Sequence, residues 1–219
     1  MPGVIFDKAG NLYGTTLRGG DYAACGGGGC GTVFELSPKG EPWTESILCS
    51  FQGTGDGQYV VAGLVFDKSG ALYGTTVYGG TGYGNVFKLS PPVAQGDAWT
   101  ESVLYDFDSV SEDGYEPESG VIFDGKDLIG TTAMGGSGGC SVNGFGVGCG
   151  TVFRLTPPKT GNGAWIEKIL WEIPPWGNGG QWPTDAPTLH GGSLYGTTGG
   201  VVGDGPCQFG CGAVFEIVP

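Results

Sequence analysis

The sequence predicts an all-β fold, a four-bladed β-propeller, on three observations. A block reading Leu-Tyr-Gly-Thr-Thr, or a close variant, begins at residues 12, 72, 128 and 194. The apolar segments are short, alternate with polar or small residues, and show no helical period. Glycine and proline, 48 and 14 of 219 residues, separate these segments as turn residues do. Repeats of 56 to 66 residues with four short strands have the size of propeller blades.

Each repeat contains strand-like blocks in a fixed order. A tight turn with Asp and Gly joins the first and second blocks, and a Gly-rich long loop joins the second and third. A Pro-containing loop joins the third and fourth blocks. The blocks are residues 4–7, 12–16, 31–36 and 43–48 in the first repeat, 64–67, 72–76, 86–89 and 99–104 in the second, 121–124, 128–132, 151–155 and 165–170 in the third, and 188–190, 194–198 and 213–217 in the fourth.

One blade cannot bury both of its faces, so we expect the blades to pack side by side in a single domain over residues 1–219. The fourth blade lacks its outer strand, and an unpaired edge invites pairing. Three interpretations follow: the ring closes imperfectly, the chain is a piece of a longer protein, or two copies combine as a homodimer. The predicted blades cover approximately residues 2–51, 62–107, 119–173 and 186–219.

The charge balance excludes several classes of partner. The net charge is −13 with only nine basic residues. Nucleic acids and anionic membranes require clustered Lys and Arg, so neither is an expected partner. No apolar run is long enough for membrane insertion. Met1 is followed directly by a strand-like segment, which predicts that any export signal lies outside this chain.

Six of the seven cysteines form pairs within the long loops, and the second repeat lacks both members. Cysteines present or absent together predict one disulfide within each loop, and hence an oxidising compartment, extracellular or at the cell surface. Zinc is the alternative, but the spacings share no pattern and the loops lack His. Cys49 is unpaired on a strand, where we expect an inert thiol. The predicted disulfides are Cys25–Cys30, Cys140–Cys149 and Cys207–Cys211.

The loops from the fourth strand of one repeat to the first strand of the next, here called crossover loops, break the repeat and therefore predict the functional site. Tyr59, Tyr115 and Trp182 are expected at equivalent points just before the first strand, and Trp176 adds a further aromatic ring. Aromatic faces beside carboxylates suit stacking and hydrogen bonding to a sugar. The alternative is that these aromatics seal the gap between blades.

The leading interpretation is a non-catalytic binding or display module that recognises a glycan or a surface protein. An extracellular hydrolase or lyase acting on polysaccharide is one alternative, and a purely structural spacer is another. Glycoside hydrolysis requires paired carboxylates. Were the protein an enzyme, the candidates would be Glu116, Glu118 and Asp185 in the crossover loops, although Glu116 and Glu118 are only two residues apart.

No cofactor is expected. Asp7, Asp67 and Asp124 follow the first strand of their repeats and are predicted to cap the turn after it. Calcium is the alternative, because Asp7 and Asn11 supply oxygen atoms, but their spacing matches no EF-hand loop. His190, the only histidine, stands at this position in the fourth repeat and is predicted to be structural.

The repeated blocks resemble the GloVer tandem-repeat family, whose members carry Leu-Tyr-Gly-Thr-Thr, then Gly-Gly, then Gly-Thr-Val-Phe-x-Leu many times. The resemblance covers nearly all of residues 2–219. It implies a propeller-like fold and an exported bacterial protein, often with a C-terminal anchor. This sequence departs from that pattern in having few repeats and no anchor. The shared motif is structural, so the resemblance transfers no catalytic residue.

Overall fold

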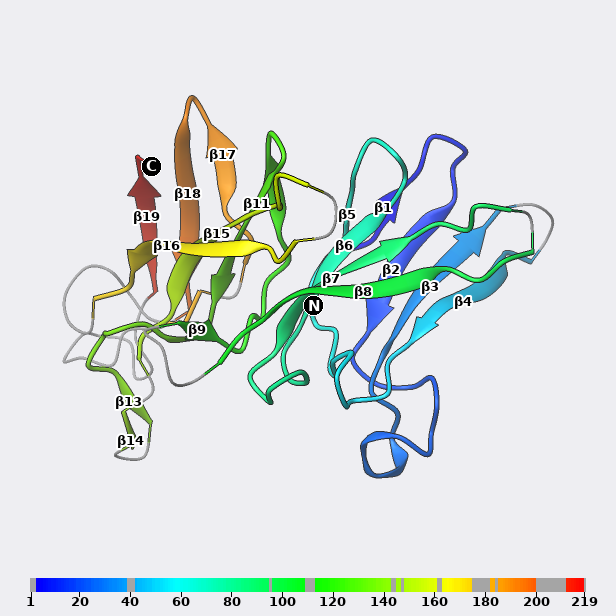
Figure 1. Cartoon of the computed structure of the whole chain (residues 1–219), viewed down its shortest axis with the longest axis horizontal. Helices are drawn as coiled ribbons and strands as arrows, with labels where there is room; N and C mark the ends of the chain where they lie inside the picture. Colours follow the sequence, from blue (N-terminus) through cyan, green and yellow to red (C-terminus); the bar gives the residue numbers. More distant parts are fainter. Residues whose placement is uncertain are drawn as a thin grey trace. The chain divides into compact units, whose positions relative to one another are not determined.

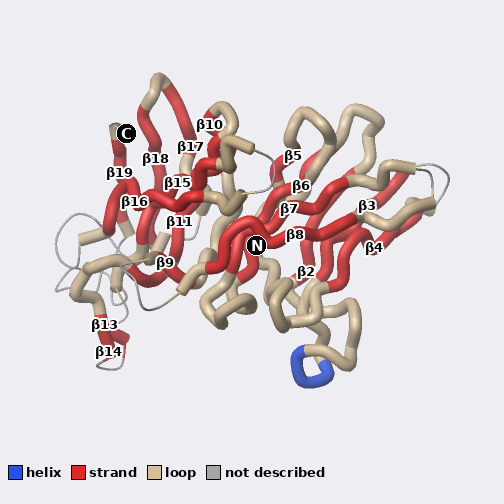
Figure 2. The backbone as a smooth tube through the Cα atoms, viewed as in Figure 1, coloured by secondary structure: helices blue, strands red, loops and turns tan. Residues whose placement is uncertain are grey.

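The computed structural model describes residues 3–38, 42–94, 96–108, 113–142, 145–146, 148–160, 163–174, 182–183, 185–199 and 212–218. In these ranges the regular structure is β-strand, apart from a 3-10 helix at Cys25–Gly27 (Figure 2). No helix there is long and apolar enough to cross a membrane. The chain divides into two compact units, Met1–Asp106 (unit 1) and Phe107–Pro219 (unit 2).

Unit 1 contains two four-stranded antiparallel sheets, one for each of the first two repeats (Figure 1). Strands that are consecutive in the chain are neighbours in the sheet, as the short turns and loops between the blocks require. The first sheet has the order β1 (Ile5–Phe6), β2 (Leu12–Thr16), β3 (Thr32–Ser37) and β4 (Thr44–Ser50), and the second has the order β5 (Val65–Phe66), β6 (Leu72–Thr76), β7 (Asn85–Ser90) and β8 (Thr100–Asp106).

Unit 2 contains the sheets of the third and fourth repeats, together with two short strand pairs. The described part of the chain thus confirms the prediction of an all-β fold made of antiparallel sheets. The third sheet has the order β10 (Ile122–Asp124), β11 (Asp127–Thr132), β15 (Thr151–Thr156) and β16 (Ile166–Glu172), the fourth has β17 (Thr188–His190), β18 (Ser193–Thr198) and β19 (Ala213–Ile217), and the short pairs are β9 (Gly114–Tyr115) with β12 (Met134–Gly135) and β13 (Ser141–Val142) with β14 (Phe145–Gly146).

The glycine inside each Leu-Tyr-Gly-Thr-Thr block lies opposite a phenylalanine on the neighbouring strand. In the first repeat Gly14 pairs with Phe34, and a Cβ atom at Gly14 would stand 2.7 Å from the Phe34 ring. No side chain fits at that distance, so the glycine is required for the ring to lie flat across the strand. The same pairing holds in the other repeats: Gly74 with Phe87, Gly130 with Phe153 and Gly196 with Phe215.

The core of unit 1 lies between its two sheets. Tyr13 and Val33 from the first sheet pack with Leu72, Phe87 and Leu89 from the second. In unit 2 the third and fourth sheets pack in the same way: Ile129 and Val152 contribute from the third, and Leu194 and Phe215 from the fourth.

The predicted turn caps are present in the first two repeats. The Asp7 carboxylate accepts hydrogen bonds from the Ala9 N–H (2.8 Å) and the Asn11 N–H (2.9 Å). Asp67 does the same for Ser69 and Ala71, at 2.8 and 2.9 Å. The third repeat differs, because Asp124 Oδ2 lies 3.0 Å from Arg154 Nη2 in an ion pair; His190, in the fourth, is exposed.

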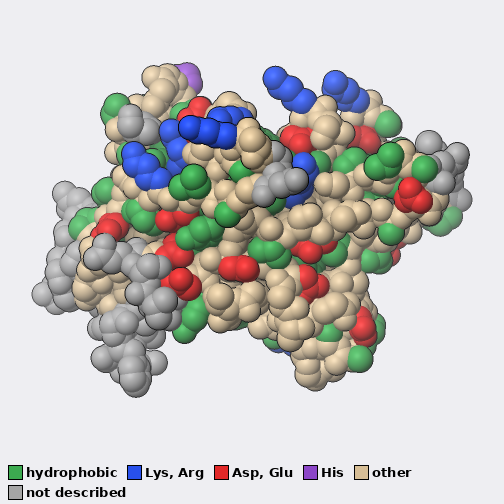
Figure 3. All heavy atoms as spheres, viewed as in Figure 1, with side chains coloured by type: hydrophobic (Ala, Val, Ile, Leu, Met, Phe, Trp, Pro, Cys, Tyr) green, Lys and Arg blue, Asp and Glu red, His purple; other side chains and the backbone are tan. Residues whose placement is uncertain are grey.

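Most of the described basic side chains lie outside the loops discussed below; Arg18, in the long loop of the first repeat, is an exception. Figure 3 shows Lys and Arg side chains on both units, with acidic side chains spread over the visible face. In unit 1 most of the visible basic side chains lie at the end where the β1–β2 and β5–β6 turns are. Lys8 and Lys68 belong to these two turns.

Candidate functional site

In unit 1 the long loop of the first repeat and the first crossover loop lie at the same end of the sheets, opposite the β1–β2 and β5–β6 turns (Figure 1). These loops span residues 17–31 and 51–64. The Tyr59 N–H donates to the Cys30 carbonyl at 2.7 Å, and the Tyr59 carbonyl accepts from the Val77 N–H at 3.2 Å. The backbone of Tyr59 therefore links the long loop of one repeat to the end of strand β6 in the next.

Tyr59, Glu116 and Trp182 share an uncommon backbone conformation, with φ values of 61°, 55° and 54°. This left-handed region costs a residue with a side chain roughly 1–2 kcal/mol, so surrounding contacts must hold it. The Glu116 and Trp182 carbonyls accept N–H groups of Ala133 (3.0 Å) and Gly199 (2.9 Å), as the Tyr59 carbonyl accepts Val77. These three residues are structurally equivalent.

This equivalence corrects the predicted alignment of the aromatic residues. Tyr115 pairs with Met134 in the β9–β12 ladder, and the residue that makes the corresponding bridge in unit 1 is Gln58, which pairs with Tyr78. Tyr115 therefore lies one residue before the position held by Tyr59. The sequence comparison matched aromatic side chains, whereas the backbone hydrogen bonds define the equivalent positions.

Tyr59 lies in a cluster of polar and aromatic side chains that the sequence did not predict. Its ring is 5.9 Å from the Tyr78 ring, centroid to centroid, at an interplanar angle of 76°. The Arg18 guanidinium carbon is 5.4 Å from the Tyr59 ring centroid, within range of a cation–π interaction. Tyr59, Tyr78 and Gln58 are half-buried, and Arg18 is exposed. We call Arg18, Gln58, Tyr59 and Tyr78 the tyrosine cluster.

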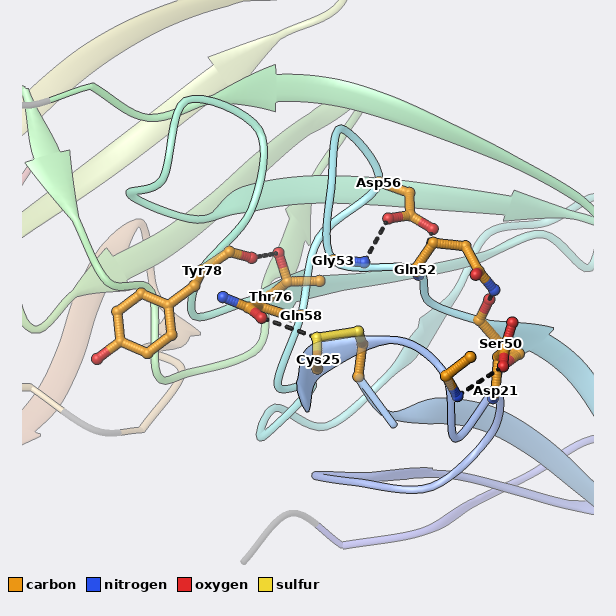
Figure 4. The surroundings of a disulfide bond; sticks show 11 residues. Asp21, Cys25, Ser50, Gln52, Gly53, Asp56, Gln58, Thr76 and Tyr78 are labelled. Atoms are coloured by element: carbon orange, nitrogen blue, oxygen red, sulfur yellow. Dashed lines mark hydrogen bonds between the residues drawn. A yellow bond between two sulfur atoms is a disulfide. The ribbon is translucent and has the colours of Figure 1, made fainter. Parts of the chain in front are cut away.

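A disulfide forms one wall of this cluster (Figure 4). Cys25 and Cys30 are bonded, with their Cα atoms 5.3 Å apart. Gln58 Oε1 lies 2.9 Å from Cys25 Sγ. A Cβ atom at Gly53 would stand 2.8 Å from Cys25 Sγ and 2.9 Å from Cys30 Sγ, so the disulfide packs directly on the crossover-loop backbone.

Asp56 and Ser50 stabilise the backbone behind the disulfide. The Asp56 carboxylate accepts the N–H groups of Gln52 at 2.8 Å and Gly53 at 3.1 Å, and closes a tight turn. Ser50 Oγ accepts the Asp21 N–H at 2.8 Å, which joins strand β4 to the long loop. Figure 4 shows these groups on one side of the disulfide and Tyr78 on the other. The disulfide and these hydrogen bonds therefore hold the loop backbone beside the tyrosine cluster.

Glu101 and Cys49 lie near Asp56, and both have raised pKa values. Burial, followed by the charges of Asp56 and Asp106, raises the pKa of Glu101 to about 7. Burial, with the charges of Glu101 and Asp56, raises the pKa of the Cys49 thiol to about 12. A thiol of that pKa is protonated at neutral pH and a poor nucleophile, which agrees with the expectation of an inert cysteine.

In unit 2, Trp182 stands at the position equivalent to Tyr59. Its N–H donates to the Cys149 carbonyl at 3.3 Å, and Cys149 is bonded to Cys140, with Cα atoms 5.1 Å apart. The indole Nε1 of Trp182 is buried without a hydrogen-bond partner. Trp176 and the predicted Cys207–Cys211 pair lie outside the described residues.

The three candidate catalytic carboxylates lie in two crossover loops of unit 2. Ser119 Oγ lies 2.7 Å from Thr131 Oγ1, and Thr131 Oγ1 donates to the Asp185 carbonyl at 3.4 Å. The segments that carry Glu118 and Asp185 therefore meet at Thr131. Loss of hydration raises the pKa of Glu118.

Glu116, in contrast, has a backbone function. Its carbonyl accepts the Ala133 N–H, as described above.

Glu167, a further carboxyl group of unit 2, has a raised pKa. Burial first, then the charge of Asp113 and a hydrogen bond with it, raises the pKa of Glu167 well above its ordinary value. Glu167 occupies the position of Glu101 in its repeat, and Asp113 that of Asp56.

The described residues contain no group of three or more His, Cys, Asp or Glu side chains that could hold a metal ion. In the proposed calcium position, Asp7 Oδ2 also accepts the Asn11 side-chain amide at 2.9 Å and the Tyr13 hydroxyl at 3.2 Å. Both Asp7 carboxylate oxygens thus accept hydrogen bonds from residues at or near the turn.

Comparisons with known proteins bear on the family and not on the ligand. The chain is similar, at 15% identity and a TM-score of 0.45, to the structure of an alpha-L-arabinofuranosidase (CtGH43) from Clostridium thermocellum. The match covers 89% of this chain and 59% of that structure's length. Comparison with curated proteins finds no match. The sequence profile of the Gloeobacter/Verrucomicrobia repeat matches residues 2–219, so the chain belongs to that repeat family.

Proposed function

We propose that this protein is a non-catalytic carbohydrate-binding module that acts outside the cell, with the tyrosine cluster of unit 1 as its site. The observation that carries the proposal is the position of Tyr59. Its ring is in contact range of both the Arg18 guanidinium and the Tyr78 ring, and the amide of the preceding residue, Gln58, lies against the Cys25–Cys30 disulfide. Its backbone is held by hydrogen bonds from two repeats.

The chemistry of the cluster suits a sugar. The apolar face of a pyranose ring stacks on an aromatic side chain, and its hydroxyl groups require donors and acceptors at the edge. Arg18 supplies donors, Gln58 supplies both a donor and an acceptor, and the Tyr78 hydroxyl supplies either. A site whose backbone is already ordered loses less conformational entropy on binding.

The architecture that we propose is a propeller with one blade from each of the four repeats. All four sheets show the same glycine–phenylalanine register, which supports four blades of one kind. The two disulfides support an oxidising, extracellular location, because such bonds are rare in reducing compartments.

The experiment is a glycan array followed by titration calorimetry of the best oligosaccharide, with wild type and Tyr59→Ala. We expect Tyr59→Ala to weaken binding at least tenfold, since loss of aromatic stacking costs more than about 1 kcal/mol. Tyr22→Ala is the matched control, because Tyr22 belongs to the long loop that carries Arg18 but is 70% exposed and lies outside the cluster. Equal affinities for Tyr59→Ala and wild type would refute this site, and binding to no glycan would favour a structural spacer.

A second candidate function is hydrolysis of a polysaccharide in unit 2. The observation that favours it is the meeting of the Glu118 and Asp185 segments at Thr131, together with the raised pKa of Glu118, as expected of a general acid. Reducing-sugar release from the array hits, measured for wild type and Glu118→Gln, tests it. Turnover that falls at least a hundredfold in Glu118→Gln, with binding retained, would support catalysis; absence of turnover in the wild type would exclude it.

A further inference from the structure

Arg18 is exposed, but the backbone that carries it is ordered. It lies two residues beyond strand β2, at the start of the long loop of the first repeat. The next residue, Gly19, donates its N–H to the Gly28 carbonyl at 3.0 Å, and its own carbonyl accepts the Gly31 N–H at 3.2 Å. These two bonds close the long loop beside Arg18 and limit the positions that its side chain can reach.

Two contacts place the Arg18 side chain at the tyrosine cluster. Its guanidinium carbon lies 5.4 Å from the centroid of the Tyr59 ring. Its Nη1 atom lies against Gly28, where a Cβ atom would stand only 3.1 Å away. A cation–π interaction depends on the charge of the guanidinium and not on directed hydrogen bonds, so it leaves the N–H donors of Arg18 available.

Among the described residues, the chain supplies no anion for this guanidinium. The ion pairs there join Arg154 to Asp124 and Asp127 in unit 2, and the arginine side-chain hydrogen bond is also made by Arg154. Arg18 has neither, in a chain with 22 acidic and nine basic residues. Its planar set of five donors therefore keeps its capacity to bind a ligand.

The two loops that form the cluster contain one acidic residue each, and both carboxylates are engaged. In the long loop, Asp21 Oδ1 accepts the Ala23 N–H at 2.9 Å. In the crossover loop, both oxygens of Asp56 accept N–H groups of their own turn. These carboxylates stabilise the loop backbone, and neither forms an ion pair with Arg18.

Another cation–ring contact of unit 1, at the opposite end of the sheets, includes a carboxylate. Lys88 Nζ lies 5.5 Å from the centroid of the Tyr73 ring, and the Tyr73 hydroxyl donates to the Asp67 carboxylate at 3.2 Å. The chain itself therefore brings cation, ring and carboxylate together there. At Tyr59 the described residues provide the cation and the ring, and an anionic ligand would complete the same combination.

We infer that the sugar bound at the tyrosine cluster carries a carboxylate, as a uronic acid does, and that Arg18 is the residue that selects it. This inference rests on the carbohydrate-binding function proposed above. The guanidinium fork matches the two oxygens of a carboxylate with parallel, charge-assisted hydrogen bonds. The carboxylate of a uronic acid is bonded directly to the pyranose ring, so it lies at the edge of a sugar that stacks on an aromatic side chain. A sulfate ester stands further from the ring.

A ligand of this kind is compatible with the net charge of −13. Nucleic acids and anionic membranes present many charges together and require clustered basic residues. A single carboxylate requires only a single guanidinium, which Arg18 provides.

Calorimetric titration of the full chain with paired ligands, at neutral pH, tests the inference. The ligands are galacturonate and glucuronate trisaccharides, each paired with the same trisaccharide after reduction of its carboxyl groups to alcohols. Wild type should bind the better acidic trisaccharide at least tenfold more tightly than its reduced partner, because reduction removes the charge-assisted hydrogen bonds. Arg18→Gln should bring the ratio of the two affinities close to one. Arg18→Lys keeps the charge without the planar fork and should give an intermediate ratio.

Two further variants separate this inference from the proposed function. Lys68→Gln removes the same charge from the β5–β6 turn, at the opposite end of unit 1, and should keep the wild-type ratio. Tyr59→Ala should weaken the binding of both members of a pair, as the proposed function requires.

Equal affinity of wild type for both members of each pair would overturn the inference, and the proposed function would stand if Tyr59→Ala still weakened both. Failure of every trisaccharide to bind would overturn both. A preference for the acidic member that survives in Arg18→Gln, or that Lys68→Gln also abolishes, would overturn the inference, because another residue or the overall charge would then recognise the carboxylate. Tighter binding of a sulfated galactose trisaccharide than of either uronate would also overturn it.

Discussion

The first and second repeats carry nearly the same strands but differ in what surrounds them. Phe34 and Phe87 occupy equivalent positions, yet Phe87 is fully buried and Phe34 only partly. The first long loop is closed by a disulfide, and the second is shorter and has none. Glu101 is half-buried near Asp56, whereas its equivalent Glu45 is exposed. Equal sequence in a repeat therefore does not mean equal environment, and the environment sets stability and chemistry.

The largest expected effect is a difference in stability between alanine variants of the two phenylalanines. Phe87→Ala should lower the free energy of unfolding by about 3–5 kcal/mol, because it opens a cavity in the core of unit 1. Phe34→Ala should cost roughly 1–2 kcal/mol, because part of its ring already contacts water. Urea denaturation of the wild type and the two variants measures both losses. Equal losses in the two variants would contradict the difference in burial.

The disulfide of the first repeat should have the next largest effect. Replacement of both Cys25 and Cys30 by Ser should lower the free energy of unfolding by about 2 kcal/mol, since the bridge closes a short loop. It should also weaken sugar binding, because Gln58 and Gly53 contact the sulfur atoms. Cys49→Ser, which removes a thiol without breaking a bridge, is the control. Affinity that survives loss of the bridge would show that the tyrosine cluster is ordered without it.

The smallest effect concerns pH. The pKa of Glu101 is about 7 in the folded protein, against about 4.5 for an ordinary Glu, so between these values the folded state binds more protons than the unfolded state. Stability therefore falls as the pH rises through this window. Glu101→Gln should remove that contribution and stabilise the protein at pH 8 by about 1 kcal/mol, allowing for the partial exposure of the group.

Melting curves from pH 4 to pH 8 for wild type, Glu101→Gln and Glu45→Gln check this expectation. The Glu45 variant is the matched control from the first repeat. A pH dependence that is the same in all three proteins would show that Glu101 does not carry the proton.

Several features of the fold could be predicted from local sequence. The alternation of the Leu-Tyr-Gly-Thr-Thr block predicted strands, and the joint presence of Cys25 and Cys30 predicted their bond. The Asp7 turn was also predicted, because its hydrogen bonds reach only residues two to six positions away. Each of these depends on neighbours in the chain.

The candidate site was predicted only in part. Tyr59 and Trp182 were correctly placed at equivalent positions, but Tyr115 was not, because the backbone bridge of β9 places Glu116 there. Arg18 and Tyr78 were missed entirely. They lie 41 and 19 residues from Tyr59 in the chain, and no pattern of spacing connects them to it. The one feature of the sequence that could have drawn attention to Arg18 is that it is one of only nine basic residues.

The sequence by itself determined the repeat, the strands and the two faces of each sheet, because alternation and turn chemistry act between residues close in the chain. Only the tertiary structure decided which faces are covered, which tyrosine meets Arg18 and why Glu101 holds its proton. Burial and electrostatic interaction depend on which residues meet in space, and residues of the same type in the same motif meet different neighbours.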